Sequence, residues 1–436
     1  MHRSLDSTIR TLRQGLDLRL DEDAIERARR SVGHRWRSCL PTPSVLIRWF
    51  LPQVLHGNTA IEHITLIAGR RFTASAYCQA RARLPLAVPQ ALLRRLIESL
   101  RPLTLGDDGR WLGHRTFLID GSAFSMPDAP ELRAHFGQPG AQRPGRGFPV
   151  AKIPALFHAR TGLLLSVTAA PPRTHEMSRV EAVHGLFEPG DVLLGDCGFC
   201  SHAHLAPPHK RGVHAAFGVH QKQLIDFTPG RPQATKGGPA GRPRSRWVGG
   251  LGRLDQIVEW HRPEARPGWM SAEDFEALPA TPRLRELRYK ITRKGSRSGE
   301  VTLVTTLLDG QTYTAEALAE LYRGRWRVEG KLRALKQTMG MDELKCRSVA
   351  GVRKELMAYA IVYNLVRPVM VEAADRQGVD PDRVSFIDAM RWLIEARPGD
   401  GLPRLVVNPS RPDRLEPRVR KRRPKQYPLM TKSRQQ

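Results

Sequence analysis

Two short apolar runs, each closed by an aspartate, restrict the folds open to this chain. Phe117-Leu-Ile119 leads into Asp120, and Val192-Leu-Leu-Gly195 leads into Asp196. Short apolar runs bounded by turn residues are typical of buried strands, so both carboxylates are expected at strand ends. Two ionised carboxylates brought together are costly unless a cation neutralises them, which indicates a divalent metal site with oxygen ligands. Two solvated turn aspartates are the alternative interpretation.

Strand-like runs on either side of these two predict a mixed sheet. Ala151 to His158 and Leu163 to Ala169 flank the turn Arg160-Thr-Gly162, which predicts a hairpin. A helical pattern from Ser178 to Phe187 stops at Glu188-Pro-Gly190, directly before the run that ends in Asp196. Strand, hairpin, helix and strand in this order predict an α/β fold in which helices pack on a mixed sheet.

Changes in composition along the chain predict its division into domains. The N-terminal part has the periodicity of helices, whereas the stretch from Phe227 to Pro282 is rich in Gly, Pro and Arg and precedes further strand-like runs. We therefore expect a helical N-terminal domain at 1–105, the two parts of a core at 106–226 and 309–400, a β-rich insertion at 227–308, and a basic tail at 401–436.

The charge of the chain points to a polyanionic partner. There are 70 Lys and Arg against 43 Asp and Glu, a formal net charge of +27. Nucleic acid is the first candidate, and a well-solvated basic surface is the alternative. The segment Thr73 to Arg83 begins with an N-cap residue type and carries Arg81 and Arg83, so we expect DNA contacts there. A structural helix with solvated arginines explains the same pattern nearly as well.

The sequence indicates a cytoplasmic protein without a membrane segment. Residues 1–20 alternate charged and apolar side chains, unlike a signal peptide. No apolar run approaches the ~20 residues needed to cross a bilayer, the nearest being Leu356 to Val366. Five cysteines, an odd number, argue against a secreted disulfide framework.

A third acidic residue belongs to a polar set with helical spacing. Tyr322, Arg325, Glu329 and Lys336 fall within an arc of about 60° at ~100° per residue. Glu329 would complete a set of three carboxylates, and the other three side chains would offer donors to phosphates. Such acids could hold two divalent cations that promote in-line attack on phosphorus. A salt-bridged surface helix is the alternative, because Arg325 and Glu329 are an i,i+4 pair.

The same residues carry a resemblance to a known family. Leu321-Tyr-Arg-Gly-Arg-Trp-Arg-Val-Glu329, followed by Leu335-Lys336, resembles the Tyr, Arg, Glu, Lys signature of DDE transposases of the insertion sequence 4 type. Asp120-Gly-Ser and Asp196-Cys-Gly-Phe-Cys-Ser201 resemble that family's segments around its first two catalytic aspartates. The resemblance extends from about residue 30 to the basic tail. Cys197 stands where relatives often have Arg, which weakens phosphate binding there but leaves the acids in place.

The resemblance implies a fold, a chemistry and partners. The fold would be a ribonuclease H-like core interrupted by a β-rich insertion. Asp120, Asp196 and Glu329 would be catalytic and would bind two Mg²⁺ ions, with Mn²⁺ as a substitute. Tyr322, Arg325 and Lys336 would contact the DNA end, and Trp326 would occupy the family's aromatic position. The partners would be the terminal inverted repeats of the element, target DNA and a second copy of the chain, acting at the nucleoid.

Two further motifs leave alternatives open. Cys197-Gly-Phe-Cys200 with His202 and His204 could be half of a zinc or redox site, but a second ligand pair is missing at useful spacing. We therefore favour two buried, inert thiols. Trp247, Trp260 and Trp269 are candidates to stack on a flipped base, a role that requires an exposed ring.

Two other functions compete with an active transposase. A catalytically inactive, transposase-derived protein would bind DNA ends and keep the charge, but it would not need all three acids. A basic RNA-associated or structural protein would have no reason to align Tyr322, Arg325, Glu329 and Lys336. We therefore favour a transposase that cleaves the ends of its element and transfers the strands into a target.

Overall fold

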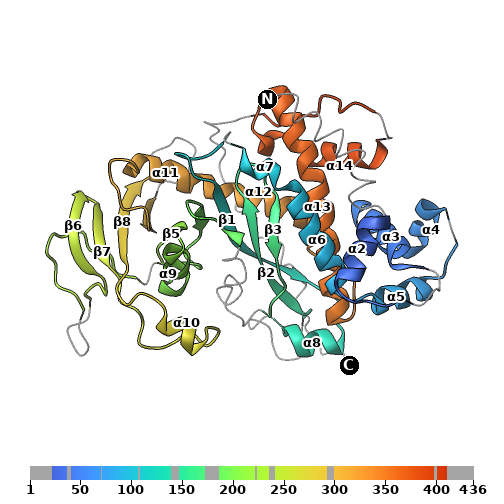
Figure 1. Ribbon diagram of the computed structural model, residues 1–436, viewed down its shortest axis with the longest axis horizontal. Helices are drawn as coiled ribbons and strands as arrows, with labels where there is room; N and C mark the ends of the chain where they lie inside the picture. The colour runs from blue at the N-terminus through green and yellow to red at the C-terminus, as the bar shows by residue number, and fades with distance from the viewer. Residues whose placement is uncertain are drawn as a thin grey trace.

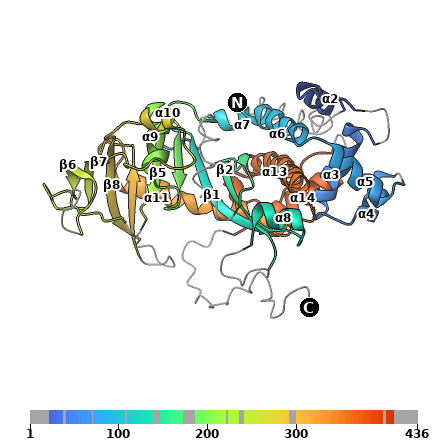
Figure 2. The same ribbon diagram turned by 90° about the horizontal axis from the view of Figure 1, so that it is seen from below.

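The computed structural model describes residues 22–36, 41–69, 71–106, 109–138, 147–171, 186–220, 223–234, 241–291, 299–396 and 400–409. They form an elongated α/β molecule, with the N-terminal helices packed at one end of a large sheet and strands of the expected insertion at the other (Figures 1 and 2). Of the helix expected over Ser178 to Phe187, only the last two residues are described, and the basic run from Arg411 to Lys425 lies outside the described residues.

The described strands form one nine-stranded mixed sheet in the order β3-β2-β1-β4-β5-β9-β8-β7-β6. The strands are β1 (Thr116–Ser125), β2 (Val150–His158), β3 (Leu164–Val167), β4 (Val192–Gly195), β5 (His214–Gly218), β6 (Arg246–Gly252), β7 (Asp255–Glu259), β8 (Arg283–Lys290) and β9 (Glu300–Thr305).

The α-helices are α2 (Glu22–Ser31), α3 (Pro43–Leu55), α4 (Ile61–Ala68), α5 (Ala74–Arg83), α6 (Ala87–Leu100), α7 (Pro102–Leu105), α8 (Pro130–Phe136), α9 (His202–Lys210), α10 (Ala272–Glu276), α11 (Ala315–Arg323), α12 (Arg327–Arg333), α13 (Val349–Gln377) and α14 (Phe386–Glu395). Short 3-10 and π segments, given below where they matter, connect some of them.

Strands β1 to β5 carry the two aspartates. β1 pairs antiparallel with β2, and β2 with β3, so the predicted hairpin is present; it turns at Gly162, whose φ of +68° suits a glycine. β4 runs parallel to both β1 and β5. Ile119 is the partner of Gly195 in the parallel register, so the next residues, Asp120 of β1 and Asp196 directly after β4, stand at the same level of the sheet.

The expectation that Asp120 ends its strand is wrong. β1 continues to Ser125, and Asp120 pairs with Ala155 of β2. The continuation, Gly-Ser-Ala-Phe-Ser, lacks the apolar run typical of a strand, and its pairing with Val150 to Pro154 of β2 holds it extended. The pairing of β1 with β4, by contrast, stops at Ile119, so Asp120 is the first residue of β1 beyond this pairing.

The segment expected to form a β-rich insertion extends this sheet. β6, β7, β8 and β9 pair antiparallel in sequence order, and β9 continues onto β5, where Thr305 to Leu303 face Ala216 to Gly218. β5 is therefore an interior strand, and the insertion adds to the core sheet instead of forming a separate one. The domain limits themselves stay predictions.

α13 is the central helix of the molecule, and it includes the apolar run Leu356 to Val366. It is long and apolar enough to cross a membrane, but 94% of its apolar window is buried inside the fold. α6, α3 and α14 pack against it (Figure 1). Its position identifies it as a core helix that N-terminal and C-terminal elements share.

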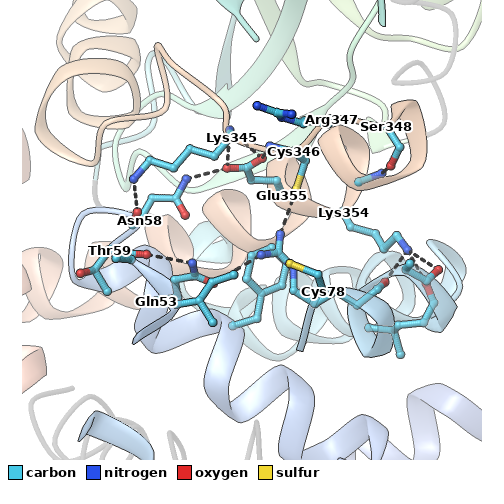
Figure 3. A pocket seen from close by; sticks show the side chains of 17 residues that line it. Gln53, Asn58, Thr59, Cys78, Lys345, Cys346, Arg347, Ser348, Lys354 and Glu355 are labelled. Atoms are coloured by element: carbon cyan, nitrogen blue, oxygen red, sulfur yellow. Dashed lines mark hydrogen bonds between the residues drawn. The ribbon is translucent and has the colours of Figure 1, made fainter. Parts of the chain in front are cut away.

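Buried polar contacts tie the N-terminal helices to the start of α13. The carboxylate of Glu355 is fully buried and accepts hydrogen bonds from the Asn58 side chain and from the backbone amides of Lys345 and Cys346 (Figure 3). Nearby, Lys354 Nζ donates to the carbonyl groups of Arg81, Ala82 and Leu84 at the end of α5. These contacts line a pocket of about 540 Å³ between the helical part and the core.

Candidate active site

The sequence-predicted acids line one open groove of about 540 Å³ at the edge of the sheet. The groove is lined by Asp120, Gly121, Ser122, Asp196, Arg325, Trp326, Glu329, Leu332, Arg333, Lys336, Gln337 and Asp342. Its walls come from β1, the residue after β4, and the segment from the 3-10 turn to the π segment. Residues more than 200 positions apart in the sequence therefore meet here.

Local hydrogen bonds fix one oxygen of each aspartate. Asp120 Oδ1 accepts from the Gly121 amide at 2.8 Å, and Asp196 Oδ1 accepts from the Gly198 amide at 2.9 Å. The second bond closes a turn of the kind that aspartate favours after a strand. A Cβ at Gly198 would lie 3.1 Å from Asp196 Oδ1, so this turn has little room for a side chain. Both carboxylates are half-buried.

Glu329 faces the groove from α12. The helix buries Val328 and Leu332 against the sheet side and leaves Glu329 exposed. A 3-10 turn (Gly324–Trp326) precedes α12, and a π segment (Ala334–Thr338) follows it. The residues 322–336, whose spacing is helical, therefore lie in α-helical, 3-10 and π-helical turns and not in one α-helix.

The 3-10 turn buries Arg325 beside Asp120. The guanidinium carbon lies 4.6 Å from the centre of the Trp326 ring, and Nη1 lies 3.9 Å from Asp120 Oδ2. Only 7% of Arg325 is exposed, and its Nε has no hydrogen-bond partner among the described residues. A buried, incompletely satisfied cation at an open groove is suited to an anion that arrives from outside.

Tyr322 lies beside Arg325, whose guanidinium carbon is 5.5 Å from the centre of the Tyr322 ring, but it does not line the groove. It is 7% exposed and absent from the groove lining, and its hydroxyl points to the end of β5, where a Cβ at Gly218 would lie 2.5 Å from it. Burial raises the pKa of its hydroxyl above the usual range. The shared arc thus predicted the nearness of Tyr322 to Arg325, but not the burial of the Tyr322 side chain.

Lys336 and Trp326 do line the groove. Lys336 lies in the π segment and is half-buried, and Trp326 is 55% exposed, an unusually open position for so large an apolar ring. Trp326 could therefore stack on a base or sugar, which a core tryptophan could not.

The donor set of the groove suits a hard divalent cation. Four carboxylates and no thiolate or imidazole line it, and oxygen ligands are those that Mg²⁺ and Mn²⁺ take. The three acids surround the groove without closing on one point: within the described ranges, no three His, Cys, Asp or Glu side chains are grouped closely enough to hold a metal ion. The oxygen donors of the groove are thus of the kind that Mg²⁺ and Mn²⁺ take, and the acidic side chains are spread along its walls.

The two arginines expected to contact DNA differ in their surroundings. Arg81 lies over the Phe50 ring at 3.7 Å and donates to Gln53 and to the sulfur of Cys346, so its guanidinium holds α3, α5 and the core together. Arg83 is exposed and donates to Gln79 of its own helix. The N-cap prediction at Thr73 is confirmed, since its hydroxyl accepts from the Ala76 amide.

The cysteine motif and the insertion tryptophans are only partly as expected. Cys197 is exposed, so the expectation of two buried thiols is wrong for it; partial burial, and then the charge of Asp196, raise the pKa of its thiol. Trp260 is buried, with its indole donating to Glu286, and is thereby unsuited to base stacking. Trp269 stacks on His204, and Trp247 is half-buried.

Sequence reasoning missed part of the groove. Arg333 and Gln337 follow Glu329 at intervals of four residues, a spacing that could have placed them beside it. Asp342 is a fourth acid; its carbonyl accepts from the Ser125 amide at the end of β1, and no local pattern marks it.

The chain is basic, and its mixed sheet and helical segment bring four acids and three cationic side chains to one open groove, an arrangement suited to proteins that act on phosphodiester backbones. The comparison with known families is more specific: the Transposase DDE domain family matches residues 111–365, and the chain belongs to this family.

Similar proteins agree with this assignment. The chain is 29% identical over 397 residues to the transposase InsG of insertion sequence element IS4 from Escherichia coli (strain K12), covering 85% of this chain and 82% of that protein. It is 30% identical over 179 residues to the putative transposase InsZ of the same organism, covering 39% and 59%. These matches confirm the resemblance to DDE transposases of the insertion sequence 4 type.

Among solved structures, the piggyBac transposase synaptic complex with hairpin DNA aligns with 11% identity and a TM-score of 0.39 over 87% of this chain and 81% of that one.

Proposed function

We propose that this transposase cleaves the ends of its own element and joins the freed 3′-hydroxyl groups to target DNA, using Asp120, Asp196 and Glu329 as ligands for two divalent cations. The observation that carries the proposal is the groove itself, which gathers these three acids from β1, the end of β4 and α12. Bound Mg²⁺ or Mn²⁺ would activate the attacking oxygen and stabilise the leaving oxygen.

The chain's own residues would bind and orient the DNA end. Arg325 presents buried donors beside Asp120, and Lys336 adds a second cation on the same wall, so a phosphate in the groove would be held between them and the acids. Trp326 would stack on the terminal nucleotide from the exposed rim. Tyr322, whose hydroxyl lies against the end of β5, would support the turn that carries Arg325.

We also propose that strands β1 to β5 are the ribonuclease H-like core. Their order, β3-β2-β1-β4-β5, with an antiparallel meander followed by two strands parallel to β1, supports this assignment. The remaining partners, namely terminal inverted repeats, target DNA and a second copy in a synaptic dimer at the nucleoid, follow from the same proposal. The inactive, DNA-binding alternative gains no support from the groove, which keeps all three acids.

The proposal is tested by cleavage of the element's own terminal repeats in the presence of Mg²⁺. We expect the wild type to cut at the element end and Glu329→Gln to bind the same DNA without cutting it. Arg391→Gln on the exposed face of α14 removes one charge away from the groove and serves as the control. Cleavage that persists in Glu329→Gln would contradict the proposal.

A further inference from the structure

α12, which carries Glu329, is too short to hold its own position. It spans seven residues between a 3-10 turn and a π segment. Helices of fewer than about 12 residues are marginal without tertiary contacts, so the direction of Glu329 depends on what anchors α12. The buried side chains of Val328 and Leu332 hold α12 against the core. Because apolar contacts are non-directional, they fix the rotation of the helix about its own axis less well.

Two ion pairs fix the side of α12 opposite to Glu329. Lys331 is 2% exposed, and its Nζ lies 2.6 Å from Asp382 Oδ2. Arg327, one turn earlier, lies 2.8 Å from Asp380 Oδ2. Both acids belong to the short turn around the 3-10 segment Pro381–Arg383. Glu329 is two residues from each cation, so it projects about 200° away from them, towards the groove.

The same turn is bound to the sheet. Asp382 Oδ1 also accepts from Arg367 of α13 at 3.1 Å, and Arg367 Nε donates to the Thr161 carbonyl at 2.7 Å. Thr161 lies in the turn between β2 and β3, and β2 pairs along its length with β1, which holds Asp120. These contacts connect β1, which carries Asp120, through the sheet and the turn around Asp382 to α12, which carries Glu329.

Stability alone does not account for this buried pair. Removing two charges from water costs several kcal/mol per ion, and well-packed apolar residues often serve a fold equally well in their place. An ion pair with a 2.6 Å contact does, however, fix the distance and direction between two elements, as an apolar contact does not.

We propose that Lys331, acting through Asp382, is a positioning residue that sets the rotation of α12 so that Glu329 faces the groove that Asp120 and Asp196 line. This inference rests on the proposed function, since it concerns how the third acid reaches the shared site. Lys331 itself has no contact with the groove, so its effect is indirect.

The test measures Mn²⁺ binding to DNA-free protein by electron paramagnetic resonance of the unbound ion, together with the unfolding temperature. Lys331→Met should weaken Mn²⁺ binding about tenfold, the lower end of the range for groups that orient metal ligands. Lys354→Met is the matched control, because Lys354 is also buried and tied to three carbonyl groups, away from the groove. It should lower the unfolding temperature and leave Mn²⁺ binding unchanged.

A second variant keeps the test decisive if Lys331→Met does not fold. Asp382→Asn retains the size and one acceptor oxygen, but it replaces the other oxygen with an amide donor and removes the charge, so it should weaken Mn²⁺ binding in the same direction. If folded Lys331→Met or Asp382→Asn binds Mn²⁺ like the wild type, the positioning role is wrong. Asp120→Asn tests the metal site separately from the positioning role of Lys331. If this variant binds Mn²⁺ like the wild type, the proposed metal site is wrong, and the positioning role is wrong with it.

Discussion

Replacing Gly218 with alanine should displace the Tyr322 hydroxyl from the end of β5. The new Cβ would lie 2.5 Å from that oxygen and 3.5 Å from the ring carbon that bears it. Comfortable separations are about 3.5 Å, so the two groups must part by about 1 Å. Tyr322 is only 7% exposed and packed in the main core, so we expect a loss of about 1–3 kcal/mol in the free energy of unfolding.

The displacement should also reach the groove. Tyr322 lies two residues before the 3-10 turn that carries Arg325, and an error of about 1 Å in a catalytic group can lower the rate on the order of 100-fold. Tyr322→Phe removes the oxygen that collides with the new Cβ. The double variant should therefore be more stable than Gly218→Ala alone, with a coupling of about 0.5–3 kcal/mol.

Guanidinium chloride denaturation of the wild type, both single variants and the double variant measures this coupling, provided that the slopes of the transitions agree. Gly249→Ala is the control, because a Cβ there meets nothing within 4 Å. If Gly218→Ala unfolds at the wild-type midpoint, or if the double variant is no more stable than Gly218→Ala alone, then the Tyr322 hydroxyl does not lie where the structure places it.

Three further predictions concern single side chains. Trp326→Ala should weaken binding of transposon-end DNA about 5- to 150-fold without changing the unfolding midpoint, because the ring is 55% exposed; unchanged affinity would exclude stacking. Trp260→Phe removes the indole donor to buried Glu286 and should cost about 1–3 kcal/mol of stability, whereas DNA affinity should stay the same. Burial, reinforced by Arg115, lowers the pKa of His158 to about 3, so only the unfolded chain takes up this proton between pH ~6.5 and ~3. The free energy of unfolding should fall as the pH drops through that window, and it should fall less steeply in His158→Gln. Equal pH dependence in the wild type and the variant would contradict the lowered pKa of His158.

The features that sequence reasoning predicted best are those with strong local signals. The apolar runs before Asp120 and Asp196 are strands, and the turn at Gly162 joins a hairpin. The Thr73 N-cap is present as well. Strand polarity and register then bring the two aspartates together, because parallel neighbours end their shared pairing at the same level.

The features that escaped prediction depend on contacts between distant segments. β1 continues past Asp120 only because β2 pairs with it, and the insertion joins the sheet only because β9 pairs with β5. Tyr322 is absent from the groove because its side chain is buried at the end of β5, and Arg81 is held by Phe50 and Cys346 and so serves packing. None of these has a signature in the neighbouring sequence.

The central claim is that three acids distant in sequence share cations. It is tested most directly by the anomalous scattering of Mn²⁺ in crystals of the transposase bound to its end DNA. The account predicts two Mn²⁺ ions roughly 3.5–4 Å apart, with carboxylate oxygens of Asp120, Asp196 and Glu329 as ligands. Mn²⁺ bound away from the groove, or a Glu329 carboxylate turned away from the ions, would contradict it.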